Sequence, residues 1–282
     1  SRTIDPADVC NLHCLHCGLS RPHLVHASRQ SPMAVPVFAW IAETLGRRMD
    51  ILCLGCLREP LVHPEAVELI RVLNRLDTTL SRRIFTNGQL LDTAVADALV
   101  EGHTPWRLYI SLDSSRPEVY ERIRRPGSFT RLMANLERLL AHRSQGSPME
   151  IIFNSLLMRP NLDHFLEILD LAAALGVDGV QVQELYPHDG NLELVPTAED
   201  GPRMAAVLDT ARARDGQGGV RVSFLGFDAA QAGPGELANA AMNHLGVVYP
   251  FGQRTPLGSI LDPAGREAIL RFYDLAHDAL AA

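Results

Sequence analysis

The stretch that decides the fold runs from residue 8 to residue 18 and reads DVCNLHCLHCG. It holds three of the five cysteines of the chain, Cys10, Cys14 and Cys17, in a CxxxCxxC spacing. Three thiolates in one short loop can ligate three irons of a [4Fe–4S] cluster and leave the fourth iron open to an outside ligand. The spacing therefore favours an iron–sulfur site.

Zinc is the alternative metal for this loop, because His13 and His16 stand beside the cysteines and zinc takes four nitrogen or sulfur ligands in a tetrahedral array. Cys53 and Cys56 could complete such a set. Their odd separation places the two thiols on opposite faces of an extended strand, so joint ligation requires the strand to end between them. We expect Cys53, inside an apolar strand, to lie in the core.

Downstream of the loop, strand-like and helix-like segments alternate. Continuous apolar runs predict strands that are buried on both faces, as in a parallel sheet with helical crossovers. Such a chain folds as a doubly wound sheet or as a barrel of about six β/α units. The expected strands cover residues 49–56, 82–88, 106–113, 149–158 and 177–185, and the expected helices 37–48, 64–76, 91–102, 116–125, 129–143 and 162–175.

The regular alternation of predicted strands and helices ends after residue 193. One helix (198–214), one strand (220–226), a Gly/Ala/Pro-rich stretch and a last helix (265–279) follow. We therefore predict two domains, a barrel over residues 1–193 and a small C-terminal cap over residues 194–282.

Composition excludes several classes of protein. The chain of 282 residues carries 33 acidic and 26 basic residues, a net charge of −7, which argues against a general nucleic-acid binder with a basic face. No apolar run reaches the length of a membrane span, and the first residues lack the order of a signal peptide. An odd number of cysteines makes a disulfide framework unexpected. We expect a cytoplasmic protein without nucleic-acid or membrane partners.

Five motifs in order give the chain a resemblance to the radical SAM superfamily over residues 5–190. They are CNLHCLHC (10–17), LREPLVHPE (57–65), Thr86-Asn87-Gly88, Ser111-Leu112-Asp113 and RRPGSFTRLMANLERL (124–139). The resemblance implies a partial (β/α)6 TIM-like barrel with a small C-terminal extension. It also implies two cofactors, a [4Fe–4S] cluster on Cys10, Cys14 and Cys17 and S-adenosyl-L-methionine (SAM), and an external one-electron reductant of the flavodoxin or ferredoxin type.

The same resemblance implies a set of residues that bind SAM. His16 stands where the family places a residue near the adenine, and Glu59 belongs to the loop at the methionine end. That loop departs from the family, because Leu57-Arg58 replace two glycines. Glu59 then has an alternative role as a helix cap. The further candidates are Ser111, Asp113, Asn154, Ser155 and Gln183, with strand-end hydration as the alternative for the last three. Arg124 and Arg125 either reach the SAM carboxylate or form a solvated helix face.

The C-terminal stretch GVVYPFGQRTPLGSILDPAGREAILRFYD (246–274) resembles the closing part of SPASM or twitch extensions. Phe251 stands where those extensions have a cysteine, and no cysteine follows Cys56. Auxiliary iron–sulfur clusters, which those extensions usually hold, are therefore not expected.

The resemblance implies reductive cleavage of SAM to a 5′-deoxyadenosyl radical, which abstracts hydrogen from an unactivated C–H bond. The expected substrate is a peptide, sugar or aminoglycoside-type natural product, and a redox-neutral outcome such as epimerisation or rearrangement is favoured. Cys56 lies at the C-terminal end of a predicted barrel strand and is the candidate catalytic residue, as a donor of a hydrogen atom to the substrate radical. The alternative is that Cys56 only packs as a small buried hydrophobic residue. The alternatives are a SPASM-type dehydrogenase, a C–C or C–S bond-forming peptide maturase, and a non-catalytic zinc or Fe–S scaffold.

Overall fold

A computed structural model describes most of the first 225 residues and a few short segments after them. The described residues are 2–18, 32–46, 51–55, 58–76, 80–101, 105–144, 148–185, 187, 190–225, 227, 240–242, 247–250 and 258–259. Cys56, Phe251 and the predicted last helix (265–279) lie outside them. No helix within this part of the chain is long and apolar enough to cross a membrane.

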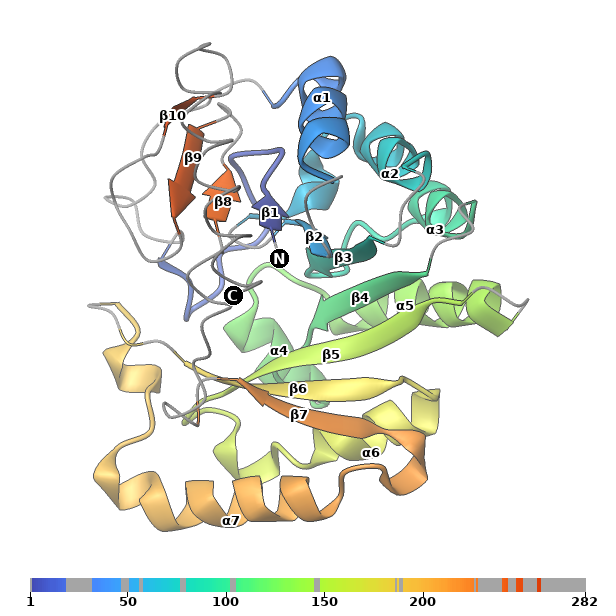
Figure 1. Cartoon of the computed structure of the whole chain (residues 1–282). Helices are drawn as coiled ribbons and strands as arrows, with labels where there is room; N and C mark the ends of the chain where they lie inside the picture. Colours follow the sequence, from blue (N-terminus) through green and yellow to red (C-terminus); the bar gives the residue numbers. More distant parts are fainter. Residues whose placement is uncertain are drawn as a thin grey trace, which may run out of the picture.

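Seven parallel strands, neighbours in chain order, form the body of one curved sheet (Figure 1). They are β1 (Arg2–Ile4), β2 (Ile51–Leu54), β3 (Ser81–Thr86), β4 (Trp106–Ser111), β5 (Glu150–Leu157), β6 (Gly179–Glu184) and β7 (Arg221–Leu225). Beyond β1 the sheet continues with β8 (Ala240–Met242), parallel to β1, and the antiparallel β9 (Val247–Pro250) and β10 (Gly258–Ser259). The fold is an α/β, partial TIM-like barrel, as expected.

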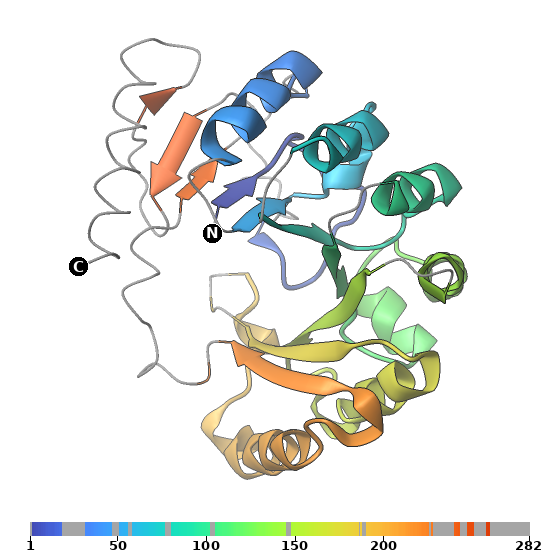
Figure 2. The ribbon, with the colours of Figure 1, turned by 45° about the vertical axis from the view of Figure 1, so that its right-hand side comes forward.

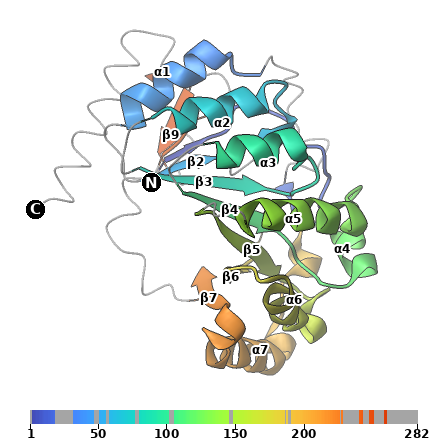
Figure 3. The ribbon, with the colours of Figure 1, turned by 90° about the vertical axis from the view of Figure 1, so that its right-hand side faces the viewer.

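The helices that connect the strands follow one another around the outer side of the sheet (Figures 2 and 3). They are α1 (Val35–Gly46), α2 (Ala66–Asn74), α3 (Thr93–Val100), α4 (Pro117–Ile123), α5 (Phe129–Ser144), α6 (Glu167–Leu175) and α7 (Gly201–Ala213). The core lies between these helices and the sheet, with side chains such as Phe38, Leu69 and Phe153 fully buried. Arg82 is also buried on this side, where it donates to Leu73 O and Leu76 O at the end of α2.

The prediction that the strands are buried on both faces is wrong for β3 and β5. Along both strands, half-buried and buried residues alternate. In β5, Phe153 and Leu157 pack in the core under the helices, so Ile152 and Asn154 face the other side. This second, concave face lines the inside of the curved sheet. Its residues are less fully buried than those of the helix face, and polar as well as apolar side chains lie there.

The sheet does not end at the predicted domain boundary. Helix α7 and strand β7 come after residue 193, and β7 pairs with β6 in parallel, from Gly179–Arg221 to Gln183–Leu225. The crossover through α7 therefore adds one more unit of the same kind as those before it. The division into residues 1–193 and 194–282 stays a prediction, since most of the second part lies outside the described residues.

Candidate active site

The cysteine loop begins directly after β1 and is held at the edge of the sheet where the parallel strands end. Two of its amides donate to the end of α4 and the turn after it, His13 N to Arg125 O at 2.5 Å and Leu15 N to Ile123 O at 2.8 Å. From the other side, Asn191 Nδ2 donates to His16 O at 3.2 Å. The loop is thus fixed by its backbone, which leaves the cysteine side chains available as ligands.

Arg58, one of the two residues that replace the family's glycines, attaches its own loop to the cysteine loop. Its guanidinium lies 3.2 Å from an oxygen of Asp8, and its backbone N–H donates to Asp5 Oδ1, also at 3.2 Å. The close approach of the chain in this loop is made by Gly55, which has φ +72° and where a Cβ would lie 2.5 Å from the ring of Pro60. Arg58 in place of a glycine therefore adds contacts to the cysteine loop and leaves the close approach of Gly55 to Pro60 unchanged.

Each of two cysteine sulfurs in the loop faces a nitrogen donor from a different element. Asn87 Nδ2, from the loop after β3, lies 3.8 Å from Cys10 Sγ, and Arg124 Nη1 lies 4.0 Å from Cys14 Sγ. The backbone N–H of Leu12 also donates to Cys10 Sγ, at 3.4 Å. Donors of this kind stabilise anionic sulfur and tune iron–sulfur clusters.

The surroundings of Cys10 and Cys14 favour the protonated form of both thiols. Burial raises the pKa of the Cys10 thiol, and it is the main reason that the pKa of Cys14 is raised to about 12, although Arg124 acts in the opposite direction. Binding of a metal centre would deprotonate these thiols. No three His, Cys, Asp or Glu side chains of the described residues are grouped to hold a metal ion. Three soft sulfur donors from one loop nevertheless match the chemistry of a [4Fe–4S] cluster, in which each thiolate binds a separate iron.

Glu59 is buried, with 2% of its surface exposed, and lies between two loops. Its carboxylate accepts from Leu61 N (3.2 Å), Thr86 Oγ1 (2.7 Å) and Asn87 N (2.7 Å). Burial raises the pKa of Glu59 to about 7, although these hydrogen bonds lower it. Glu59 therefore caps the short helix η2 (Pro60–Val62) and also positions Asn87, the residue that faces Cys10. A contact of Glu59 with SAM stays a prediction.

A buried ion pair, which the sequence did not reveal as a pair, lies behind the cysteine loop. Arg124 Nε is 2.7 Å from Asp113 Oδ2, and both side chains are almost fully buried. Burial lowers the pKa of Arg124, but the Asp113 carboxylate and Cys14 more than offset this, so the pKa is raised overall. The interpretation of Arg124 as part of a solvated helix face is wrong, whereas Arg125 is exposed. His16 Nδ1 lies 4.0 Å from the same Asp113 oxygen.

The other predicted SAM ligands divide between the two faces of the sheet. Ser111 pairs in register with Asn154, and Gln183 pairs with Leu156, so these polar residues line the concave face. The buried Oδ1 atom of Asn154 has no hydrogen-bond partner among the described residues. Ser155 points to the helix side, is fully buried, and donates to Leu112 O at 2.5 Å. We therefore remove Ser155 from the proposed SAM ligands.

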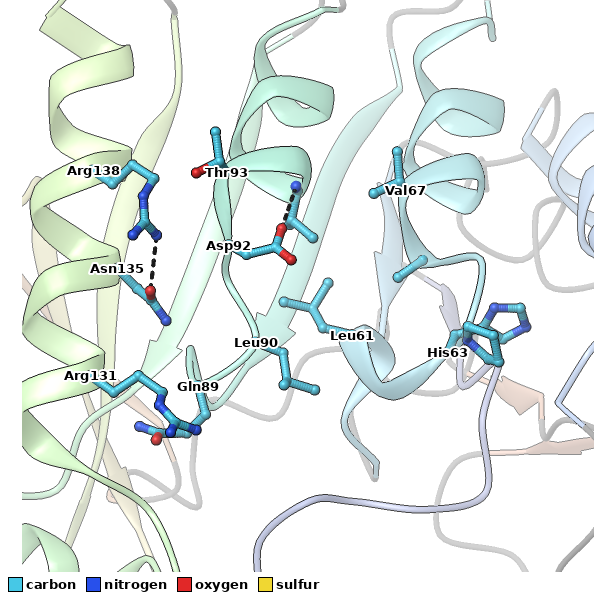
Figure 4. Close-up of a pocket in the computed structure, with 13 residues that line it drawn as sticks. Leu61, His63, Val67, Gln89, Leu90, Asp92, Thr93, Arg131, Asn135 and Arg138 are labelled. Carbon is cyan, nitrogen blue, oxygen red and sulfur yellow. Dashed lines mark hydrogen bonds between the residues drawn. The ribbon is translucent and has the colours of Figure 1, made fainter.

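A groove lies on the helix side of the sheet (Figure 4). It has a volume of about 530 Å³ and lies between α2, α3 and α5, with Leu61, Gln89, Asp92, Arg131 and Asn135 in its wall. In Figure 4, Asn135 accepts from Arg138 at 3.0 Å. A second cavity, of about 540 Å³, is lined by the cysteine loop itself, including Cys14 and Cys17, and by Arg125 and Glu193.

Comparison with known proteins by sequence gives the family of this chain. The model of the Radical SAM superfamily matches residues 4–172. GTP 3′,8-cyclase of Microcystis aeruginosa is 33% identical over 120 residues, 41% of this chain and 35% of the relative. The same enzyme of Chlorobaculum tepidum is 29% identical over 194 residues, 67% of this chain and 56% of the relative. The chain thus spans about a third to a half of the length of these relatives.

Solved structures share the fold at low sequence identity. SuiB of Streptococcus suis superposes with a TM-score of 0.69 at 15% identity, covering 96% of this chain and 64% of SuiB. The anSMEcpe structure with bound AdoMet gives a TM-score of 0.73 at 17% identity, covering 95% and 79% of the two chains. The family uses a [4Fe–4S] cluster and SAM. This chain belongs to the radical SAM superfamily and is an enzyme.

Proposed function

We propose that Cys10, Cys14 and Cys17 hold the [4Fe–4S] cluster and that the enzyme abstracts hydrogen from an unactivated C–H bond of a natural-product substrate. When bound, the cluster and SAM supply a 5′-deoxyadenosyl radical by reductive cleavage of SAM. The observation that carries the proposal is the position of the three cysteines in one loop, held by backbone bonds, with Asn87 and Arg124 facing two of the sulfurs.

The residues of the chain have separate tasks in this proposal. Asn87 and Arg124 stabilise the negative charge on the cysteine sulfurs, and Glu59 positions Asn87 through its backbone N–H. His16 is proposed at the adenine end of SAM, with its carbonyl fixed by Asn191. Ser111, Asn154 and Gln183 are proposed as polar contacts to SAM from the concave face. Asp113 is proposed to act through Arg124 and His16, since its own side chain is fully buried.

For the substrate we propose a peptide, sugar or aminoglycoside-type molecule and a redox-neutral outcome. No cysteine follows Cys56 in the sequence, so an auxiliary cluster on later cysteines of this chain, which could accept a second electron, is not part of the proposal. SuiB has been solved with a precursor peptide and anSMEcpe with a Cp18Cys peptide, and a peptide is accordingly the first substrate to try. A flavodoxin or ferredoxin is proposed as the external reductant.

A purine nucleotide is the second candidate substrate. The specific observation in its favour is that the sequence relatives reported above are GTP 3′,8-cyclases. The two candidates differ in chemistry, because a nucleotide brings phosphate groups and a planar base, whereas a peptide or an aminoglycoside brings neither.

The experiment is anaerobic reconstitution with iron and sulfide, followed by incubation with SAM and a one-electron reductant. The expected result is 5′-deoxyadenosine, with a rate that rises when the true substrate is added from a panel of peptides, aminoglycosides, sugars and GTP. An iron- and sulfide-loaded protein that forms no 5′-deoxyadenosine with any reductant or substrate would overturn the proposal.

A further inference from the structure

We propose that Arg83 binds an anionic group of the substrate, a phosphate or a carboxylate, on the concave face of the barrel. The inference rests on the proposed function, because it concerns the substrate of the same site. It starts from the observation that Arg82 and Arg83, which are adjacent in β3, lie on opposite faces of the sheet. Arg82 is bound to the end of α2, and Arg83 therefore points to the concave face.

Arg83 is a half-buried cation without an acidic partner. It forms no ion pair with any described residue, and its Nε atom is buried and has no hydrogen-bond partner in the structure. Its register neighbours are Cys53 on β2 and Arg107 on β4, neither of which carries a carboxylate. A buried donor left without a partner costs free energy, and a ligand anion would remove this cost.

The charge of the concave face supports an anion. On this face of β2 to β7 the charged side chains among the described residues are Arg83, Arg107, Glu150 and Arg221, three bases against one acid. Arg107 and Arg221 both bond to the single carboxylate of Glu150. The whole chain has a net charge of −7, so this excess of positive charge is local to β2 to β7, whereas the buried Asp5 after β1 places a negative charge near Cys53. The positive charge would attract an anionic substrate into the barrel.

Aromatic side chains lie between Arg83 and the cysteine loop. Phe85, the next residue of β3 on the same face, stacks on Tyr109 with ring centroids 4.4 Å apart, and the Arg83 guanidinium is 6.0 Å from the Tyr109 ring. Arg83 precedes Asn87 by four residues, so an extended strand places it ~13 Å from the residue that faces Cys10. A substrate anchored at Arg83 would thus lie along the aromatic pair and reach toward the cofactor end of the barrel.

The alternative is that Arg83 only packs on Tyr109 as a cation–π contact. The test is equilibrium dialysis of inorganic pyrophosphate and, separately, of succinate against the reconstituted enzyme with SAM. Wild type is compared with Arg83→Met, which keeps most of the side-chain length, with Arg83→Lys, which keeps the charge, and with Arg131→Met in the outer groove of Figure 4 as the control.

We expect at least one anion to bind wild type and Arg131→Met about tenfold tighter than Arg83→Met, a factor equal to about 1.4 kcal/mol. Arg83→Lys should lie between them. Preference for pyrophosphate assigns a phosphate-bearing substrate, and preference for succinate a carboxylate. Equal binding by wild type and Arg83→Met, or no binding by wild type, would overturn the inference. Iron content, SAM affinity and 5′-deoxyadenosine formation are measured in parallel, since their failure in wild type would count against the proposed function instead.

Discussion

The ion pair between Arg124 and Asp113 gives a prediction that follows from burial and distance. The two groups lie 2.7 Å apart with side-chain exposures of 7% and 0%. Asp113 also accepts from Leu156 N at 2.9 Å. Replacing one member of such a pair leaves the other charge buried without its partner, which is strongly destabilising even where the intact pair adds little net stability.

We predict that Arg124→Met lowers the free energy of unfolding by about 3–5 kcal/mol, the usual cost of breaking a buried pair from one side. Asp113→Asn should have a cost of similar size. The double variant should lose clearly less than the sum of the two, because it leaves neither charge stranded. The measurement is urea unfolding of the cluster-free protein followed by circular dichroism at pH 7, arranged as a double-mutant cycle.

The matched control is Arg71→Met, which breaks the exposed pair with Glu101 and should leave stability nearly unchanged. An Arg124→Met protein as stable as the Arg71→Met control would refute the reasoning. Additive losses in the cycle would do the same, because they would mean that the two side chains do not interact energetically.

Three further predictions concern Glu59 and Cys56. Burial raises the pKa of Glu59 from 4.5 to about 7. The stability that the protonated side chain contributes is therefore complete below pH 4.5 and is lost as the pH rises through 7. At ~1.36 kcal/mol per pKa unit, the loss in the free energy of unfolding is about 3 kcal/mol. Urea unfolding should show that the free energy of unfolding falls less between pH 5 and pH 8 in Glu59→Gln than in the wild type. An equal fall in the two proteins would contradict this. Glu59→Ala should weaken SAM binding, measured by calorimetry, without loss of iron, and unchanged affinity would leave Glu59 as a helix cap alone. Cys56→Ser should still form 5′-deoxyadenosine but stop inversion of the substrate, and the native enzyme in D2O should place one deuterium in the product. Full turnover by this variant, or a product without deuterium, would make Cys56 ordinary packing.

The order of strands and helices was predictable, because long apolar runs and turn residues recur at regular intervals. The faces of the strands were not. The segment 149–158 is apolar except for Glu150, Asn154 and Ser155. Asn154 and Ser155 are adjacent and both polar, so this pair alone does not tell the helix face from the concave face. The alternation in β5 separates these two residues, so that Asn154 faces the barrel interior and Ser155 bonds to Leu112 O.

Within the candidate site, the motifs pointed to the cysteine loop, Glu59 and Asp113 as candidates, whereas the contacts that these residues make depend on tertiary structure. Arg124 and Arg125 are adjacent in sequence and chemically equal, and only the geometry at the end of α4 buries the first and exposes the second. Arg82 and Arg83 are likewise adjacent and chemically equal, so the sequence does not tell which of the two faces the barrel interior. A basic pair inside a strand indicates that one member faces each side, and this pattern could have drawn attention to Arg83.

The most direct test of the central claim is formation of 5′-deoxyadenosine by the reconstituted enzyme after Cys10, Cys14 and Cys17 are all replaced with Ala. Cys53→Ala is the control, since that buried thiol lies on β2, outside the cysteine loop. The account predicts that the triple variant binds no cluster and forms no 5′-deoxyadenosine, while Cys53→Ala retains both properties. A triple variant that still cleaves SAM would contradict the assignment of the cluster to this loop.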